Sequence, residues 1–145
     1  MICQKIIIEL EPMAQSRPRF ARRGRGVVAY EKKEMKAWRT ECSKLIGEAF
    51  GTEKLIEGPL KIDATFYIQP PKYISSKVKF KKKLEAEEIF CGKKPDIDNY
   101  FKALLDSMTG IVFKDDGQVV ECSARKLYSL KPRIEFAIKG VLENE

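Results

Sequence analysis

Two pairs of aspartates stand out because they lie close together in an otherwise basic chain. Asp96 and Asp98 are separated by one residue, and Asp115 and Asp116 follow a short helical pattern. The chain has a formal net charge of +7 and contains no histidine. Without histidine, neither a Ser-His-Asp nor a Cys-His catalytic arrangement is available. Any chemistry must therefore come from carboxylates, lysine or a metal-bound water.

The spacing of these acids is suited to a divalent metal ion. Side chains at i and i+2 of an extended chain point to the same side, so Asp96 and Asp98 can converge on one ion. A short helix between two extended segments can bring Asp116 back beside them, and three oxygen ligands suit Mg²⁺ or Mn²⁺. Clustered carboxylates repel one another unless a cation lies between them. The structural alternative is that Asp98 or Asn99 caps the helix and that D-D-G is an ordinary turn.

A helix is predicted between the two acidic pairs, over Tyr100–Thr109, with Phe101, Leu104, Leu105 and Met108 on its buried face. Asp98, Lys102 and Asp106 recur at four-residue spacing on another face. Such a pair is usually a weak surface salt bridge. Beside a metal site, the Lys102 ammonium would instead contact a phosphate, stabilise transition-state charge or position a water. We expect Asp106 to support Lys102.

The positive charge predicts an anionic partner, with nucleic acid favoured over an anionic membrane surface. Arginines alternate with glycine and aromatic residues near the N-terminus, and lysines are frequent before the first acidic pair. The candidates for contact with a DNA backbone are Arg17, Arg19, Arg22, Arg23, Lys93 and Lys94. The alternative is that these residues form a solvated charge run.

The periodicity of the whole chain predicts one α+β domain, residues 1–145, with a mixed or antiparallel sheet backed by helices. Strands are predicted over residues 2–10, 60–69, 111–114, 119–130 and 132–140, and helices over residues 31–50, 75–89 and 100–109. Residues 12–30 are expected to be a loop. Trp38 and Phe90 are assigned to the core, although Phe90 is also a candidate wedge for a DNA branch point. Asp63 is expected to be solvated or salt-bridged.

The cysteines and the hydropathy pattern indicate a soluble protein of the cytoplasm. Cys3, Cys42, Cys91 and Cys122 are scattered with no C-x-x-C pair, which favours reduced thiols over a zinc knuckle or disulfides. The N-terminus has no signal-peptide pattern, and no apolar run approaches the length of a membrane span. We therefore expect no membrane partner.

The central motifs resemble those of the RusA-type Holliday junction resolvases, which are common on bacterial chromosomes and prophages. The matching segments are K-P-D-I-D-N-x-x-K-A-x-x-D, which begins at Lys94, and G-I-x-x-K-D-D-x-Q-V, which begins at Gly110. The resemblance implies a Mg²⁺-dependent homodimeric endonuclease that nicks opposing strands of a four-way DNA junction in recombination and repair. It assigns metal binding and catalysis to Asp96, Asp98 and Asp116 and a catalytic role to Lys102, with Asp115 as a neighbouring acid.

Two other functions remain open on the residues alone. The first is a DNA-binding module in which the acids only cap helices and form turns. The second is a metal-dependent nuclease that acts on flaps, single strands or other branched DNA. Cleavage assays on several DNA structures distinguish these alternatives from a junction resolvase.

Overall fold

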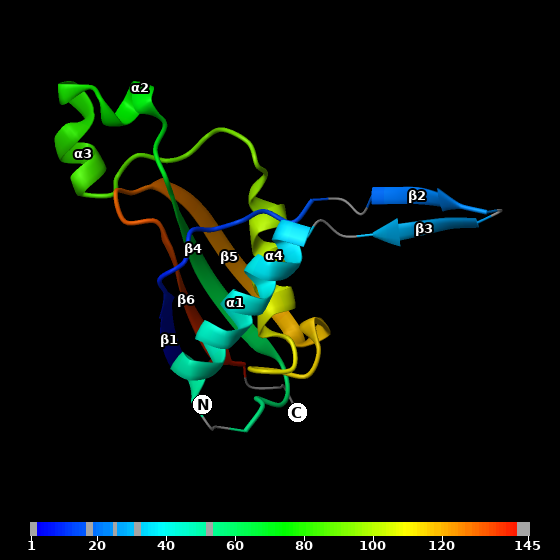
Figure 1. The fold of residues 1–145 in the computed structure, drawn as a ribbon. Helices are drawn as coiled ribbons and strands as arrows, with labels where there is room; N and C mark the ends of the chain where they lie inside the picture. Colours follow the sequence, from blue (N-terminus) through cyan, green and yellow to red (C-terminus); the bar gives the residue numbers. More distant parts are fainter. Residues whose placement is uncertain (1–2, 17–18, 25, 31–32, 52–53, 142–145) are drawn as a thin grey trace.

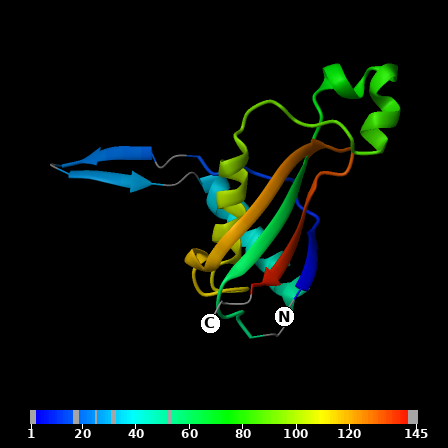
Figure 2. The ribbon, with the colours of Figure 1, turned by 180° about the vertical axis from the view of Figure 1, so that it is seen from behind.

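The computed structural model describes residues 3–16, 19–24, 26–30, 33–51 and 54–141. A four-stranded sheet carries two helices on one face, and a two-stranded hairpin extends away from this body (Figures 1 and 2). In chain order the elements are β1 (Cys3–Ile8), β2 (Arg19–Arg23), β3 (Gly26–Tyr30), α1 (Lys33–Phe50), β4 (Leu60–Ile68), α2 (Lys72–Ser75), η1 (Val78–Phe80), α3 (Lys81–Glu85), α4 (Ile97–Met108), η2 (Asp116–Gln118), β5 (Val119–Tyr128) and β6 (Arg133–Gly140).

The sheet is mixed, which confirms the predicted α+β class. Its strand order is β1-β6-β4-β5, with β4 parallel to β5 and antiparallel to β6, and with β1 antiparallel to β6. A parallel pair needs a long crossover connection, because the chain must return to the same end of the sheet. Residues 69–118 form this connection and include α4 and η2. All four predicted aspartates therefore lie in a single crossover.

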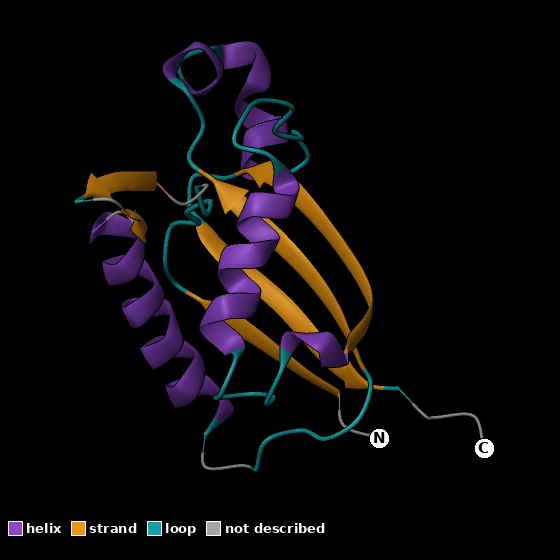
Figure 3. Ribbon diagram, turned by 90° about the vertical axis from the view of Figure 1, so that its right-hand side faces the viewer, coloured by secondary structure: helices purple, strands orange, loops and turns teal. Residues whose placement is uncertain are grey.

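The main core lies between the sheet and the two long helices, which cross the same face (Figure 3). The alternation predicted for β4 is observed, since Leu60, Ile62, Ala64 and Phe66 are fully buried. The helices contribute Met35, Trp38, Cys42 and Ile46 from α1 and Leu104 and Met108 from α4. Each large side chain buried in this way contributes about 1.5–3 kcal/mol. The core therefore holds α4, and the acids at its start, rigidly against the sheet.

The sequence predicts a loop for the basic segment near the N-terminus, but this segment contains the hairpin β2–β3. Arg19 pairs with Tyr30 and Arg23 with Gly26. Gly24 lies at the turn with a φ of 60°, a conformation that favours glycine. The second strand, G-V-V-A-Y, has the β-branched and aromatic residues that strands prefer. The prediction failed because the arginines suggested a ligand loop and hid the strand propensity of their neighbours.

The predicted helix over residues 75–89 is also wrong, because the chain forms three short pieces, α2, η1 and α3. Lys77 has extended backbone between α2 and η1, and Glu87 has a positive φ after α3. Only Ile74 and Leu84 are buried in these pieces, so no continuous apolar stripe supports one long helix. The predicted strand over residues 111–114 is likewise a turn, in which Val112 and Phe113 are fully buried.

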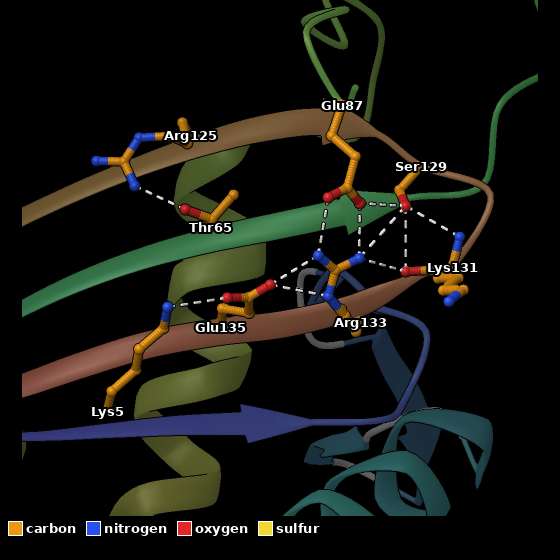
Figure 4. A network of polar contacts seen from close by, with 8 residues as sticks. All are labelled: Lys5, Thr65, Glu87, Arg125, Ser129, Lys131, Arg133 and Glu135. Atoms are coloured by element: carbon orange, nitrogen blue, oxygen red, sulfur yellow. Dashed lines mark hydrogen bonds and ion pairs between the residues drawn. The ribbon is translucent and has the colours of Figure 1, made fainter. Parts of the chain in front are cut away.

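The face of the sheet opposite α1 and α4 carries a network of charged side chains (Figure 4). Arg133 is at the centre, with its guanidinium 2.6 Å from Glu87, 2.7 Å from Glu135 and 3.9 Å above the ring of Tyr67. The hydrogen bond from Arg133 is the largest of the effects that lower the pKa of Glu87. Asp63 forms an ion pair with Arg125 at 2.7 Å, as the sequence predicted.

Candidate active site

The first acidic pair lies at the start of α4. Asp96 occupies the N-cap position with extended backbone, and its carboxylate makes no capping hydrogen bond. Asp98 lies in the first helical turn and is exposed, so the structural alternative, in which Asp98 or Asn99 caps this helix, is wrong. Because α4 begins at Ile97, the two acids do not share one extended segment. Both carboxylates remain available to a ligand, and both lie at the helix end that favours negative charge.

Lys102 connects α4 to the second acidic pair. Its ammonium Nζ lies 2.9 Å from Oδ1 of Asp106, one turn further along the helix, and 3.4 Å from Oδ2 of Asp116 in η2. These carboxylates raise the pKa of Lys102 above its usual value, and the hydrogen bond to Asp106 is the largest cause. Lys102 is therefore protonated at neutral pH. It can therefore supply positive charge and hydrogen-bond donors.

The loop before β5 is held in place by its own hydrogen bonds. Asp115 accepts a bond from the backbone N–H of Gly117 at 3.1 Å, which is the largest cause of its lowered pKa. The Gln118 side chain accepts from the backbone N–H of Lys114 and Asp115, and it donates to the carbonyl groups of Ile56 and Gly58. Asp115 therefore has a capping role, whereas Asp116 is turned toward α4.

The structure brings some of the predicted residues together and leaves others apart. Lys102, Asp106 and Asp116 form one connected group, in which Asp106 contacts Lys102 as the spacing suggested. Within the described ranges, no three acidic or cysteine side chains lie close enough together to hold a metal ion. Asp96, Asp98 and Asp116 are thus not a preformed triad. Asp98 precedes Lys102 by one turn, about 6 Å along the helix axis, on the same face.

The donor chemistry of these acids still fits a hard cation. All three carry carboxylate oxygens, the ligand type that Mg²⁺ prefers while it retains several waters. Asp96 and Asp98 are exposed, and the side chain of Asp116 is 40% exposed, so water-bound cations can reach them. The separation of the three carboxylates is consistent with their mutual repulsion. Coordination of one ion by all three would require Asp116 to turn from Lys102 toward the start of α4.

A second lysine, Lys126 of β5, holds the segment that precedes Asp96. Its ammonium donates to the backbone carbonyl oxygens of Lys93 and Pro95, each at 2.7 Å. The Lys94–Pro95 peptide bond is cis. Both partners of Lys126 are main-chain atoms, so the side chains of Lys93 and Lys94 stay exposed beside the start of α4.

The N-terminal basic segment is anchored near the same end of α4. The backbone N–H of Gln15 donates to the carbonyl oxygen of Asn99 at 3.0 Å, and Trp38 donates to the carbonyl oxygen of Glu11 at 2.8 Å. The hairpin that follows leaves the body from this region (Figure 1). Among the predicted DNA contacts, Arg19, Arg22 and Arg23 lie on β2, and Arg17 lies outside the described residues.

Two residues that position the acids were not identified from the sequence. Gln118 orders the loop that carries Asp116, and Lys126 orders the segment that carries Asp96. Gln118 had a local signal, because a capping box pairs an Asp with a Gln three residues later. Lys126 had none, because its partners lie more than 30 residues away. Its role depends entirely on the pairing of β5 with the rest of the sheet.

Comparisons with known proteins show the family of the chain. The family model described as Endodeoxyribonuclease RusA matches residues 9–139, which include every acid discussed above. The chain is also 35% identical over 141 residues to the "Uncharacterized protein YqaN" of Bacillus subtilis (strain 168), with 97% of this chain and 99% of that protein covered. In the described part of the chain, no helix is long and apolar enough to cross a membrane. The match over nearly the whole length shows that the chain belongs to the RusA endodeoxyribonuclease family.

Proposed function

We propose that this protein is a Mg²⁺-dependent endonuclease that resolves four-way (Holliday) DNA junctions by paired nicks, in recombination and repair. Membership of the RusA family supports cleavage of DNA. The observation that carries the proposal is the contact of Lys102 with Asp106 and Asp116. It brings the loop of the second acidic pair against the helix that begins at the first pair. The two acidic motifs and the Lys102 ammonium thereby occupy one exposed surface of a basic protein.

In this proposal Asp96, Asp98 and Asp116 hold Mg²⁺, for which Mn²⁺ can substitute. The metal, when bound, supplies an activated water and neutralises charge on the scissile phosphate. Lys102 donates to a phosphate oxygen and offsets the negative charge that grows there during the reaction. Asp106 keeps the Lys102 side chain directed along α4, and Asp115 maintains the turn that presents Asp116. In the hydrolysis, a water oxygen bonds to phosphorus, one P–O ester bond breaks, and the departing oxygen takes a proton.

Lys126 is expected to position Asp96 in this reaction. Lys126→Met removes both hydrogen bonds to the 93–95 backbone, and we expect junction cleavage to fall about 10- to 100-fold. Lys126→Arg retains the charge and the donors and should restore part of the rate. Lys139→Met, which removes an exposed lysine on β6, is the matched control and should leave the rate unchanged. A Lys126→Met protein that cleaves at the wild-type rate, with an unchanged melting temperature, would contradict this role.

The basic residues around the acids are proposed to hold the DNA backbone. Lys93 and Lys94 are exposed beside Asp96, Arg19, Arg22 and Arg23 lie on β2, and Arg17 precedes this strand in the sequence.

Lys94→Ala is expected to weaken binding to all junction sequences about equally, since backbone contacts do not read bases. The slope of log K against log salt should become shallower by about one, because one phosphate contact is lost. Titrations at several salt concentrations on two unrelated junction sequences measure both effects. A loss of affinity for only one of the sequences would indicate base recognition instead.

Two symmetric cuts require two equivalent active sites. A C₂ homodimer presents one site to each of two opposing strands, so we propose that the active form is a dimer in the cytoplasm. Sedimentation of the protein alone and with a junction measures the number of protomers per DNA. Two protomers per junction is the expected result, and one protomer per junction would be incompatible with paired nicks by a single complex.

The deciding experiment compares Mg²⁺-dependent cleavage of a four-way junction, a flap and a linear duplex. We expect rapid, symmetric nicking of the junction alone, and no cleavage by Asp98→Asn. Equal or faster cutting of the flap would favour a nuclease for other branched DNA. Junction binding without cleavage at any Mg²⁺ or Mn²⁺ concentration would favour the alternative that the protein is a DNA-binding module. Strand-specific end labels distinguish paired nicks from a single nick.

A further inference from the structure

Phe90 is an exposed aromatic residue next to the proposed active site. Its side chain is 69% exposed, so the prediction that it packs in the core is wrong. Isolated apolar side chains are common on protein surfaces. The surroundings of Phe90 distinguish it from such a residue, because its backbone is fixed and its ring borders a hollow that also contains Asp96.

The backbone on both sides of Phe90 is hydrogen-bonded to β5. The N–H of Cys91 donates to the carbonyl oxygen of Lys126 at 3.0 Å, and the N–H of Tyr128 donates to the carbonyl oxygen of Ile89 at 2.9 Å. Phe90 itself forms an isolated antiparallel bridge with Leu127. Cys91 and Tyr128 belong to a small core with Ile74 and Leu84, and Ile89 packs against it. The ring of Phe90 therefore projects from a rigid segment, which lowers the entropy lost when it binds a partner.

The ring lines an open hollow of about 500 Å³ at the start of α4. Asp96, Ile97, Arg125 and Lys126 line the same hollow. The hollow thus combines an aromatic ring, an apolar side chain that is 37% exposed, and charged groups. Because Lys126 also holds the segment that carries Asp96, a ligand in the hollow lies beside a proposed metal ligand.

We propose that Phe90 stacks on a nucleobase that is unstacked at the branch point of the DNA junction. This inference rests on the function proposed above. A base inside a continuous duplex has both faces covered by its neighbours, so exposing a face requires unstacking. At a branch point the stack is already interrupted, and a face is available to an aromatic side chain. Stacking of this kind tolerates any base, because every base has a π-face.

This contact provides a physical basis for preferring branched DNA to linear DNA. The basic residues proposed above bind phosphates, which a duplex and a junction both present. Phe90 adds a favourable contact that only interrupted stacking offers without cost. It also places a base next to Asp96, so the phosphate of that nucleotide is held near the start of α4. Phe90 is in this sense a positioning and specificity residue.

The test uses a junction with 2-aminopurine at the branch point, bound by Asp116→Asn protein without added metal so that no DNA is cut. Binding of the Asp116→Asn protein, which retains Phe90, should change the 2-aminopurine fluorescence. Adding Phe90→Ala to this protein should remove the change. Phe90→Ala should also weaken junction binding about 5- to 100-fold, while duplex binding changes less than about twofold. Phe90→Tyr, which keeps a ring, should retain junction affinity.

Tyr73→Ala is the matched control, because Tyr73 is an aromatic residue on α2 that is 53% exposed and does not line the hollow. It should behave as wild type in both assays. The inference is overturned if Phe90→Ala keeps the fluorescence change, or if it weakens junction and duplex binding equally. The affinities of the Asp116→Asn protein with Phe90 intact for junction and for duplex are measured first. Equal affinities would overturn the proposed function and not the inference about Phe90.

Discussion

Asp116→Asn is expected to abolish junction cleavage while junction binding stays as tight as in the wild type or becomes tighter. The substitution removes a charged oxygen ligand from the proposed Mg²⁺ site, and we expect the cleavage rate to fall on the order of 10³-fold or more. Binding is preserved because one negative charge is removed from a surface that meets phosphates. Single-turnover cleavage with end-labelled junctions and anisotropy titrations measure the two effects separately.

The matched control is Asp115→Asn at the neighbouring position. Asp115 accepts a hydrogen bond from the N–H of Gly117, and an asparagine oxygen can accept the same bond. We therefore expect Asp115→Asn to fold normally and to retain most of the cleavage activity. Equal losses in the two variants would mean that Asp116 acts through the loop structure. Cleavage by Asp116→Asn at the wild-type rate would exclude it as a metal ligand.

Lys102→Met is expected to lower the cleavage rate about 10²- to 10³-fold with little loss of stability. The large effect follows if the ammonium offsets charge that develops on the phosphate, since removal of one such donor has this magnitude. The small stability effect follows from exposure, because the side chain is 50% exposed and surface ion pairs contribute little. Single-turnover rates at saturating protein and thermal melts measure the two quantities.

Two further variants separate catalysis from structure at this position. Lys114→Met removes an exposed lysine in the same loop as Asp116 and should cleave at the wild-type rate. Lys102→Arg retains the charge and should recover part of the lost activity. If Lys102 only forms surface ion pairs with Asp106 and Asp116, then Lys102→Met would lose a little stability and keep its rate. In that outcome Lys102 would be a structural residue.

The rate should also be insensitive to titration of Lys102 near neutral pH. Asp106 and Asp116 raise its pKa above the already high usual value of lysine, so its charge is constant from acidic to mildly alkaline conditions. A decline in activity between pH 6 and pH 9 would have to come from another group.

Local sequence pattern determined much of this protein. The alternation in β4, an apolar face on α1 and the α+β class were predicted correctly. On α4, Leu104 and Met108 are buried as predicted, whereas Phe101 and Leu105 are only partly buried. Each of these predictions depends on spacing of two, three or four residues, which the chain satisfies within one element. The motifs around the two acidic pairs also led to the correct family. Predictions from the same patterns failed where the elements are short, at the β2–β3 hairpin and over residues 72–85.

Only the tertiary structure decided how the acidic motifs meet. The sequence placed Asp116 beside Asp96 and Asp98, but the turns after Met108 bring it to Lys102 in the middle of α4. Lys126 reaches the segment that carries Asp96 because its strand, β5, pairs with β4 after the long crossover connection. Phe90 is exposed because Cys91 and Ile89, and not Phe90, turn toward the small core. Spacing along the chain determines which side chains share an element, whereas the path of the backbone between elements determines which of them touch.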